Sequence, residues 1–190
     1  MRGLFIVVCV LVSTTATAQQ KVGSTGEFLG WHPKSMTFAY TLTTHSHYEP
    51  TRVTSFMKQV TKKGTRAQRL AYSGSVRERI RAEKFVLPPA MRGHRISEYV
   101  QSFALTATQR LRVVLDVGSK RLGYTVWLDD LDGRKDSRRL IGGWFDELWT
   151  GLDARVFPSP DGQWVAIVLT METNFRTLTW VEGVYVGAKK

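Results

Sequence analysis

Short runs of β-branched and aromatic residues, separated by glycine, proline and aspartate, recur along most of the chain. The clearest run covers residues 164–169 and follows the segment Ser159-Pro160-Asp161-Gly162. Pro160 presets φ, Asp161 can bond its own backbone, and Gly162 accepts a positive φ. The apolar run is short for a helix and rich in β-forming residues. The pattern therefore predicts a tight turn that leads into a buried strand.

The same alternation predicts further strands, whereas residues 19–30 are rich in small polar residues and predict a loose lead-in. One short helix is predicted over residues 76–86, because Ser75 and Glu78 form a capping box and Pro88 ends the run. Residues 97–102 fit either helix or strand, and Gly142-Gly143 predicts a break. The predicted strands cover residues 31–42, 52–62, 65–73, 103–108, 111–117, 122–128, 138–141, 164–169 and 178–186.

Residues 31–42 repeat the pattern of turn and strand, with Pro33 and Ala39 offset by 127 positions from Pro160 and Ala166. Residues 124–133 add a strand that ends in an Asp-Leu-Asp-Gly turn, and residues 138–140 read Arg-Arg-Leu. From residue 124 to residue 169 this order resembles one blade of a TolB-type β-propeller. The resemblance implies β-hairpins and says nothing about catalysis.

A propeller needs at least about four blades, so the length of the chain favours a smaller arrangement. We expect a mainly β fold: a single domain of about nine antiparallel strands in blade-like hairpins, as a sandwich or partial propeller, with one short helix. The layout also resembles short predicted secreted bacterial proteins of unknown function, which implies export.

Residues 1–18 have the features of a secretory signal peptide. Arg2 precedes an apolar run over residues 4–12, and Ala16-Thr17-Ala18 fits a cleavage site before Gln19. The run is shorter than the roughly 20 residues that span a bilayer; the alternative is a buried N-terminal strand. We expect residues 19–190 to form a periplasmic or extracellular domain that does not span the membrane. Cys9 is the only cysteine, so a processed chain has no disulfide, zinc-thiolate site or cysteine nucleophile.

Positive charge is concentrated between Arg52 and Arg95, where twelve lysines and arginines meet two glutamates. This stretch carries most of the net charge of +11 and is predicted to be a basic insert between the two blade-like ends. A localised positive field favours anionic partners, although a solvated basic face is the alternative. The predicted anion-binding residues are Arg52, Lys58, Lys62, Lys63, Arg66, Arg69, Arg77 and Arg81.

A possible metal site lies in the segment His45-Ser46-His47-Tyr48-Glu49. On a strand, alternate residues share a face, so His45, His47 and Glu49 would present two imidazoles and a carboxylate to one ion. The alternative is a polar strand end before Pro50. Without a visible fourth ligand, this pattern alone does not establish a metal centre.

Other chemistry has less support in the sequence. There is no Gly-x-Ser-x-Gly motif and no glycine-rich phosphate loop, so we predict no catalytic residue and no cofactor. Asp130 and Asp132 fit a hairpin turn, and Trp144 and Trp149 are expected to pack on the core.

We therefore expect an exported, non-enzymatic binding or scaffold module with a basic face for an anionic envelope component. The partner would be an anionic glycan, a lipid surface or an envelope protein; export argues against nucleic acid as a physiological partner. The alternative is a small metal-dependent hydrolase that uses His45, His47 and Glu49.

Overall fold

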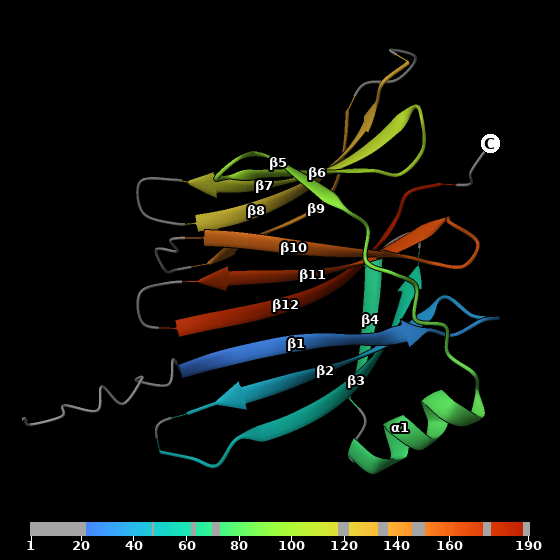
Figure 1. Ribbon diagram of the computed structural model, residues 1–190, viewed down its shortest axis with the longest axis vertical. Coiled ribbons are helices and arrows are strands. Elements are labelled where there is room, and N and C mark those ends of the chain that lie inside the picture. The colour runs from blue at the N-terminus through green and yellow to red at the C-terminus, as the bar shows by residue number, and fades with distance from the viewer. Residues whose placement is uncertain are drawn as a thin grey trace, which may run out of the picture.

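The computed structural model describes residues 22–46, 48–61, 64–69, 73–117, 122–132, 137–145, 151–172 and 176–187. Within these residues the chain forms two sheets and one helix, α1 (Ser73–Ala82) (Figure 1). In spatial order, the seven-stranded sheet contains β10 (Gly151–Pro158), β11 (Trp164–Glu172), β12 (Arg176–Tyr185), β1 (Val22–Trp31), β2 (Thr37–His45), β3 (Arg52–Thr61) and β4 (Gly64–Arg69). The five-stranded sheet contains β5 (Gly93–Ser97), β6 (Val100–Ala104), β7 (Gln109–Val117), β8 (Leu122–Asp130) and β9 (Arg138–Phe145).

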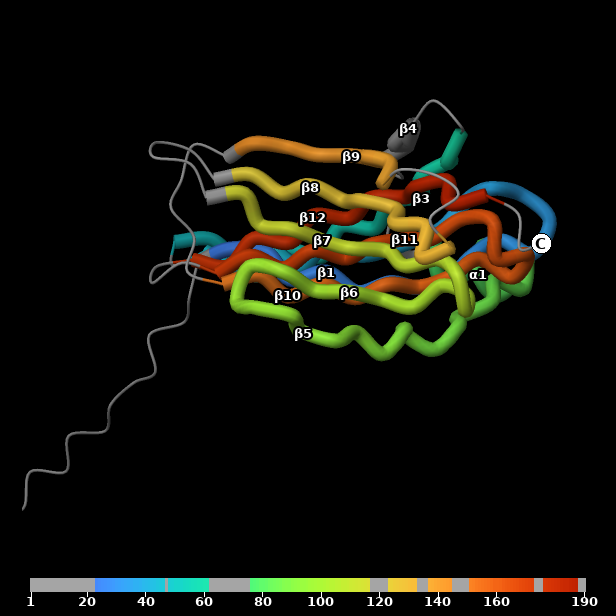
Figure 2. The backbone as a smooth tube through the Cα atoms, turned by 90° about the horizontal axis from the view of Figure 1, so that it is seen from above, coloured from blue at the N-terminus to red at the C-terminus, as the bar shows by residue number. Residues whose placement is uncertain are grey.

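The mainly β fold with one short helix is confirmed, and the sheets pack as a sandwich (Figure 2). The structure has more strands than predicted. Residues 22–30 of the predicted lead-in belong to β1, whose backbone pairs with β2 from Gly23 to Trp31 with one register shift after Phe28. The segment before the Ser159 turn forms β10, and residues 100–104 form β6. One neighbouring pair, β1 and β12, is parallel instead of antiparallel.

Two glycines that predicted a break instead lie inside β9. A Cβ added to Gly143 would approach Cε1 of Tyr124 to 2.9 Å, and one added to Gly142 would approach the guanidinium of Arg139 to 2.4 Å. Glycine therefore permits close packing against neighbouring side chains here and does not end the strand. The prediction that Trp144 packs on the core was also wrong, since Trp144 is 60% exposed. Trp149 lies outside the described residues.

The turn between β10 and β11 forms as predicted. The N–H of Gly162 donates to the carbonyl of Ser159 at 2.9 Å, and Gly162 has a φ of 68°. The N–H of Ser159 donates to the carbonyl of Trp164 at 2.8 Å. In the first repeat unit, the N–H of His32 donates to the carbonyl of Thr37, also at 2.8 Å. His32 and Thr37 precede Ser159 and Trp164 by the 127 positions of the sequence repeat. The two turns therefore share this closing hydrogen bond, although Ser35, the counterpart of Gly162, does not have a positive φ.

The two repeat units share one sheet, and that sheet folds back on itself between β12 and β1. These strands pair only where Val22 and Gly23 meet Arg176 and Thr177. In a flat sheet, β1 and β10 would be about 14 Å apart, at roughly 4.8 Å per strand. Instead the rings of Phe28 and Phe157 stack with centroids 4.5 Å apart.

As a result, β11 is buried on both faces. Val165, Ile167 and Leu169 pack towards the five-stranded sheet. Trp164, Ala166 and Val168 pack in a second core with aromatic residues of β1 and β2. The strands β10–β12 thus form a middle layer. α1 covers the outer face of β1–β3, where Val76 lies against Ala39 and Met57.

The basic stretch from Arg52 to Arg95 is not looped out between the two repeat units. Its first part forms β3 and β4 in the seven-stranded sheet, its middle forms α1, and its end lies in β5. The predicted signal peptide lies outside the described residues and stays a prediction.

Candidate anion-binding surface

The fold disperses the predicted anion-binding residues. Arg52 is exposed at the start of β3, while Arg77 and Arg81 are exposed on α1, which packs further along that strand at Met57 (Figure 1). Arg66 and Arg69 lie on β4, but their side chains are outside the described part, as are Lys62 and Lys63 entirely. Among the predicted residues whose side chains are described, Arg52 therefore does not share one face with Arg77 and Arg81.

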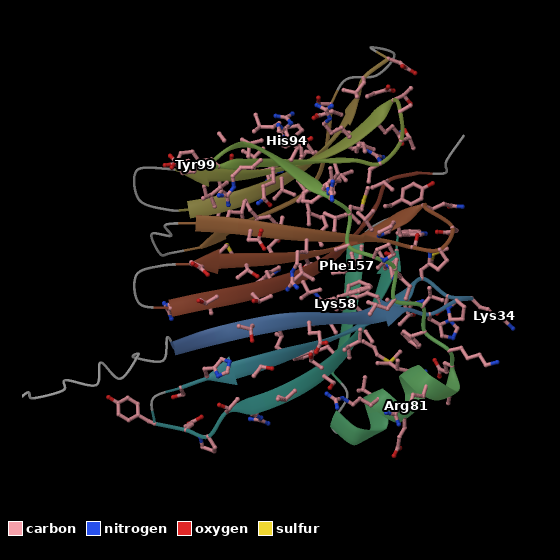
Figure 3. All side chains as sticks on the ribbon, viewed as in Figure 1. Lys34, Lys58, Arg81, His94, Tyr99 and Phe157 are labelled. Atoms are coloured by element: carbon pink, nitrogen blue, oxygen red, sulfur yellow. The ribbon has the colours of Figure 1, made fainter. Side chains whose placement is uncertain are left out.

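Lys58 is directed inward and is not available to an external anion. Its side chain is 11% exposed, and its ammonium donates to the carbonyl of Val181 and to Glu182 Oε1 at 3.2 Å (Figure 3). Its Nζ also lies 5.7 Å from the ring centroid of Tyr40. Burial, and then the charge of Glu182, raise the pKa of Tyr40 to about 12. Lys58 thus belongs to an internal polar contact between β3 and β12.

α1 is amphipathic in a way that places arginines outward. Val76 is fully buried, and Ile80 packs beside it on the sheet. Arg77 and Arg81 lie on the opposite, exposed side, and neither forms an ion pair with a residue that the structure describes. Arg79 differs, since its Nε lies 2.6 Å from Glu83 Oε1.

The helix ends four residues earlier than predicted. The N–H of Phe85 donates to the carbonyl of Ile80 at 3.0 Å, and that of Lys84 donates to the carbonyl of Arg81 at 3.3 Å. This pair of bonds is a Schellman ending, in which Lys84 takes the left-handed conformation with a φ of 53°. Phe85 packs back on Ile80, which fixes the end of the helix before Pro88 can act. The ending leaves Lys84 exposed.

A long-range pairing brings a further turn beside the helix. Trp31 and Val86 exchange two backbone hydrogen bonds of 2.8 Å, and Nε2 of His32 lies 3.5 Å from Glu83. The β1–β2 turn, with exposed Lys34 and Met36, therefore lies next to the segment that leaves α1.

We call the resulting surface the basic end, and Figure 3 labels two of its residues, Lys34 and Arg81. Its cations are exposed, and none pairs with an acidic residue in the described ranges. Glu78 is exposed on the same helix, and Glu83 is occupied by Arg79 and His32. The basic end consists of Lys34, Arg77, Arg81 and Lys84.

The sequence named two of these four residues. Lys84 belongs to the basic stretch, but its exposure follows from the helix ending. Lys34 precedes that stretch by many residues, and only the Trp31–Val86 pairing brings its turn beside α1. No local pattern in the sequence signals that pairing.

The predicted metal site stays a prediction. His45 ends β2, with Nδ1 3.5 Å from the hydroxyl of Thr51, and Glu49 is exposed. His47 lies outside the described residues. Among the residues that are described, no group of three or more His, Cys, Asp or Glu residues is arranged to hold a metal ion.

Comparison with known proteins adds no assignment: no family model, curated protein or solved structure matches this chain. Within the described ranges, no helix combines the length and the apolar character that crossing a membrane requires. The functional argument therefore rests on the surface itself.

Proposed function

We propose that this protein is an exported, non-enzymatic binding module that holds an anionic component of the cell envelope. The observation that supports the proposal most directly is the basic end. There, exposed Arg77, Arg81 and Lys84 lie on or just after α1, and the Trp31–Val86 pairing ties that segment to the turn with exposed Lys34. None of the four has a described acidic partner. Clustered cations attract polyanions through a field that a scattered distribution of the same charges does not produce.

The rest of the fold supplies a support for this surface. α1 is fixed on the sheet through Val76, and the β1–β2 turn is tied to the segment after α1 through Trp31 and Val86. The cations are thus mounted on backbone that is already ordered, which reduces the entropy lost on binding. Anionic glycans, anionic lipids and acidic protein surfaces share the charge that this surface would recognise.

Retention on immobilised heparin, a polyanion probe, tests the proposal. We expect the protein to be retained at low salt and released as salt rises, because screening weakens contacts between exposed charges. The variant Arg77→Gln/Arg81→Gln should elute at clearly lower salt. Glutamine keeps helix propensity close to that of arginine, so α1 should persist.

The matched control is Arg52→Gln/Arg110→Gln, which removes the same amount of charge from exposed positions away from the basic end. It should elute close to the unmodified protein. Equal shifts in both variants would show that total charge, and not the basic end, governs retention. That result, or an absence of retention at low salt, would refute the proposal.

A further inference from the structure

An exposed apolar run lies beside the basic end. Residues 86–90 read Val-Leu-Pro-Pro-Ala, with Lys84 before them and Arg92 after them. Val86 is 43% exposed and Leu87 is 61% exposed, and Met36 in the adjacent β1–β2 turn is 36% exposed. Figure 1 shows the segment leaving α1 and running along the outside of the molecule towards β5. Cations and unburied apolar side chains therefore share one end of the protein.

The backbone of this run has few N–H groups that would lose water on docking. Val86 has both its N–H and its carbonyl bonded to Trp31, and Pro88 and Pro89 have no N–H. Moving a backbone donor out of water is costly unless it is already hydrogen-bonded. Among residues 86–89, the N–H of Leu87 is therefore the one backbone donor without a described hydrogen bond.

The run is also held in place at both ends. Trp31 fixes Val86, and the N–H of Met91 donates to the carbonyl of Val156 in β10 at 2.8 Å. Between these two anchors, the apolar side chains point into solvent although the backbone is tied to both halves of the seven-stranded sheet. An anchored segment with outward apolar side chains needs little reorganisation in order to bind.

We infer that the basic end docks on an anionic lipid bilayer, with Leu87 and Val86 entering the headgroup region and the surrounding cations contacting the lipid phosphates. The inference rests on the proposed function and narrows its ligand to one source. A soluble polyanion offers partners for the cations but none for Leu87. An anionic bilayer offers phosphates to the cations and an apolar region to Leu87. Stable attachment to a bilayer usually combines an electrostatic and an apolar contribution of this kind.

Sedimentation with vesicles of phosphatidylglycerol and phosphatidylcholine measures the binding. The variant Val86→Ser/Leu87→Ser should weaken binding to these vesicles about tenfold, since part of the transfer free energy of two apolar side chains is lost. Its retention on heparin should not change, because its charge is the same. The matched control is Ile96→Ser/Leu131→Ser, which alters two apolar residues of similar exposure elsewhere and should bind vesicles like the unmodified protein.

Insertion can be observed directly. The only cysteine in the sequence is Cys9, so Leu87→Cys in a Cys9→Ala background carries an environment-sensitive fluorophore at one site. Its emission should shift to the blue with phosphatidylglycerol-containing vesicles and not with pure phosphatidylcholine. The same label at Ile96→Cys should show no shift with either.

The outcomes separate the two proposals. If the unmodified protein binds neither heparin nor the vesicles, the proposed function itself is refuted. Normal heparin retention with unchanged vesicle binding in Val86→Ser/Leu87→Ser would overturn only the lipid inference. Equal binding to pure phosphatidylcholine would also overturn it, because the cations would then play no part.

Discussion

Lys58 gives the sharpest test of the internal architecture. Replacing it with methionine keeps most of the side-chain stem and removes the ammonium. The carbonyl of Val181 then loses a donor, and the carboxylate of Glu182 loses its cation. The change removes the ammonium that joins β3 to these two groups of β12, and Glu182 Oε1 keeps the bond from Trp180 Nε1 at 2.9 Å.

The magnitude follows from how far water reaches the site. Removing one partner of a buried ion pair costs about 3–5 kcal/mol. Here the side chain of Glu182 is 18% exposed, so solvent recovers part of that cost. We therefore expect Lys58→Met to lower the free energy of unfolding by about 2–3 kcal/mol.

Urea denaturation measures this loss. With an m value of about 2 kcal/mol per molar urea, the midpoint should fall by about 1 M. Arg52→Met, an exposed position on the same strand, should change the free energy of unfolding by less than about 0.5 kcal/mol. The double variant Lys58→Met/Glu182→Gln should be more stable than Lys58→Met, because it no longer contains the negative charge that the Lys58 ammonium offset.

Two results would refute this reasoning. A Lys58→Met protein as stable as Arg52→Met would mean that the ammonium does not hold β3 to β12. A double variant destabilised by the full sum of the two single changes would mean that Lys58 and Glu182 are not energetically coupled.

Three further predictions concern other parts of the fold. Trp31→Phe should lower the free energy of unfolding by about 2–4 kcal/mol, because the bond from Nε1 to the carbonyl of Phe157 at 3.1 Å is buried; Trp144→Phe, at an exposed site, is the control in the same urea titration. Lys84→Gly should raise the free energy of unfolding by about 1 kcal/mol, because only glycine adopts the left-handed conformation without cost, and an unchanged midpoint would contradict the Schellman ending. Burial, and then Glu182, raise the pKa of Tyr40 to about 12, so the folded state favours the neutral phenol and loses stability as pH rises from about 10 to about 12. Tyr40→Phe should lose less stability over that range in chemical denaturation, and identical pH profiles would contradict the prediction.

Much of the local structure could be predicted from the sequence. The turn at Ser159–Gly162 and the strand after it depend on proline, aspartate and glycine in adjacent positions, and these residues act over a few bonds. The repeat at Trp31 was visible for the same reason. The prediction that Gly142 and Gly143 end a strand was wrong, because glycine is favoured both where a strand ends and where it packs closely on a side chain such as Tyr124.

The candidate surface was only partly predictable. Arg77 and Arg81 follow from helical periodicity, which turns them about 100° and about 140° around the helix axis from Val76. Lys58 was misassigned, because alternation on a strand does not reveal which face a second layer will cover. The sequence does not identify Leu87 as a surface residue, since an apolar residue followed by prolines fits a buried connection equally well.

The sequence by itself determined the turns, most of the strands and the presence of the helix, because these depend on residues close together along the chain. The tertiary structure decided how the seven-stranded sheet folds back, which face of β3 is covered, and which cations meet. Those outcomes depend on contacts between residues far apart, such as Trp31 with Phe157 and Trp31 with Val86. Such contacts form only where packing offsets the entropy of bringing distant segments together, and no local pattern encodes that balance.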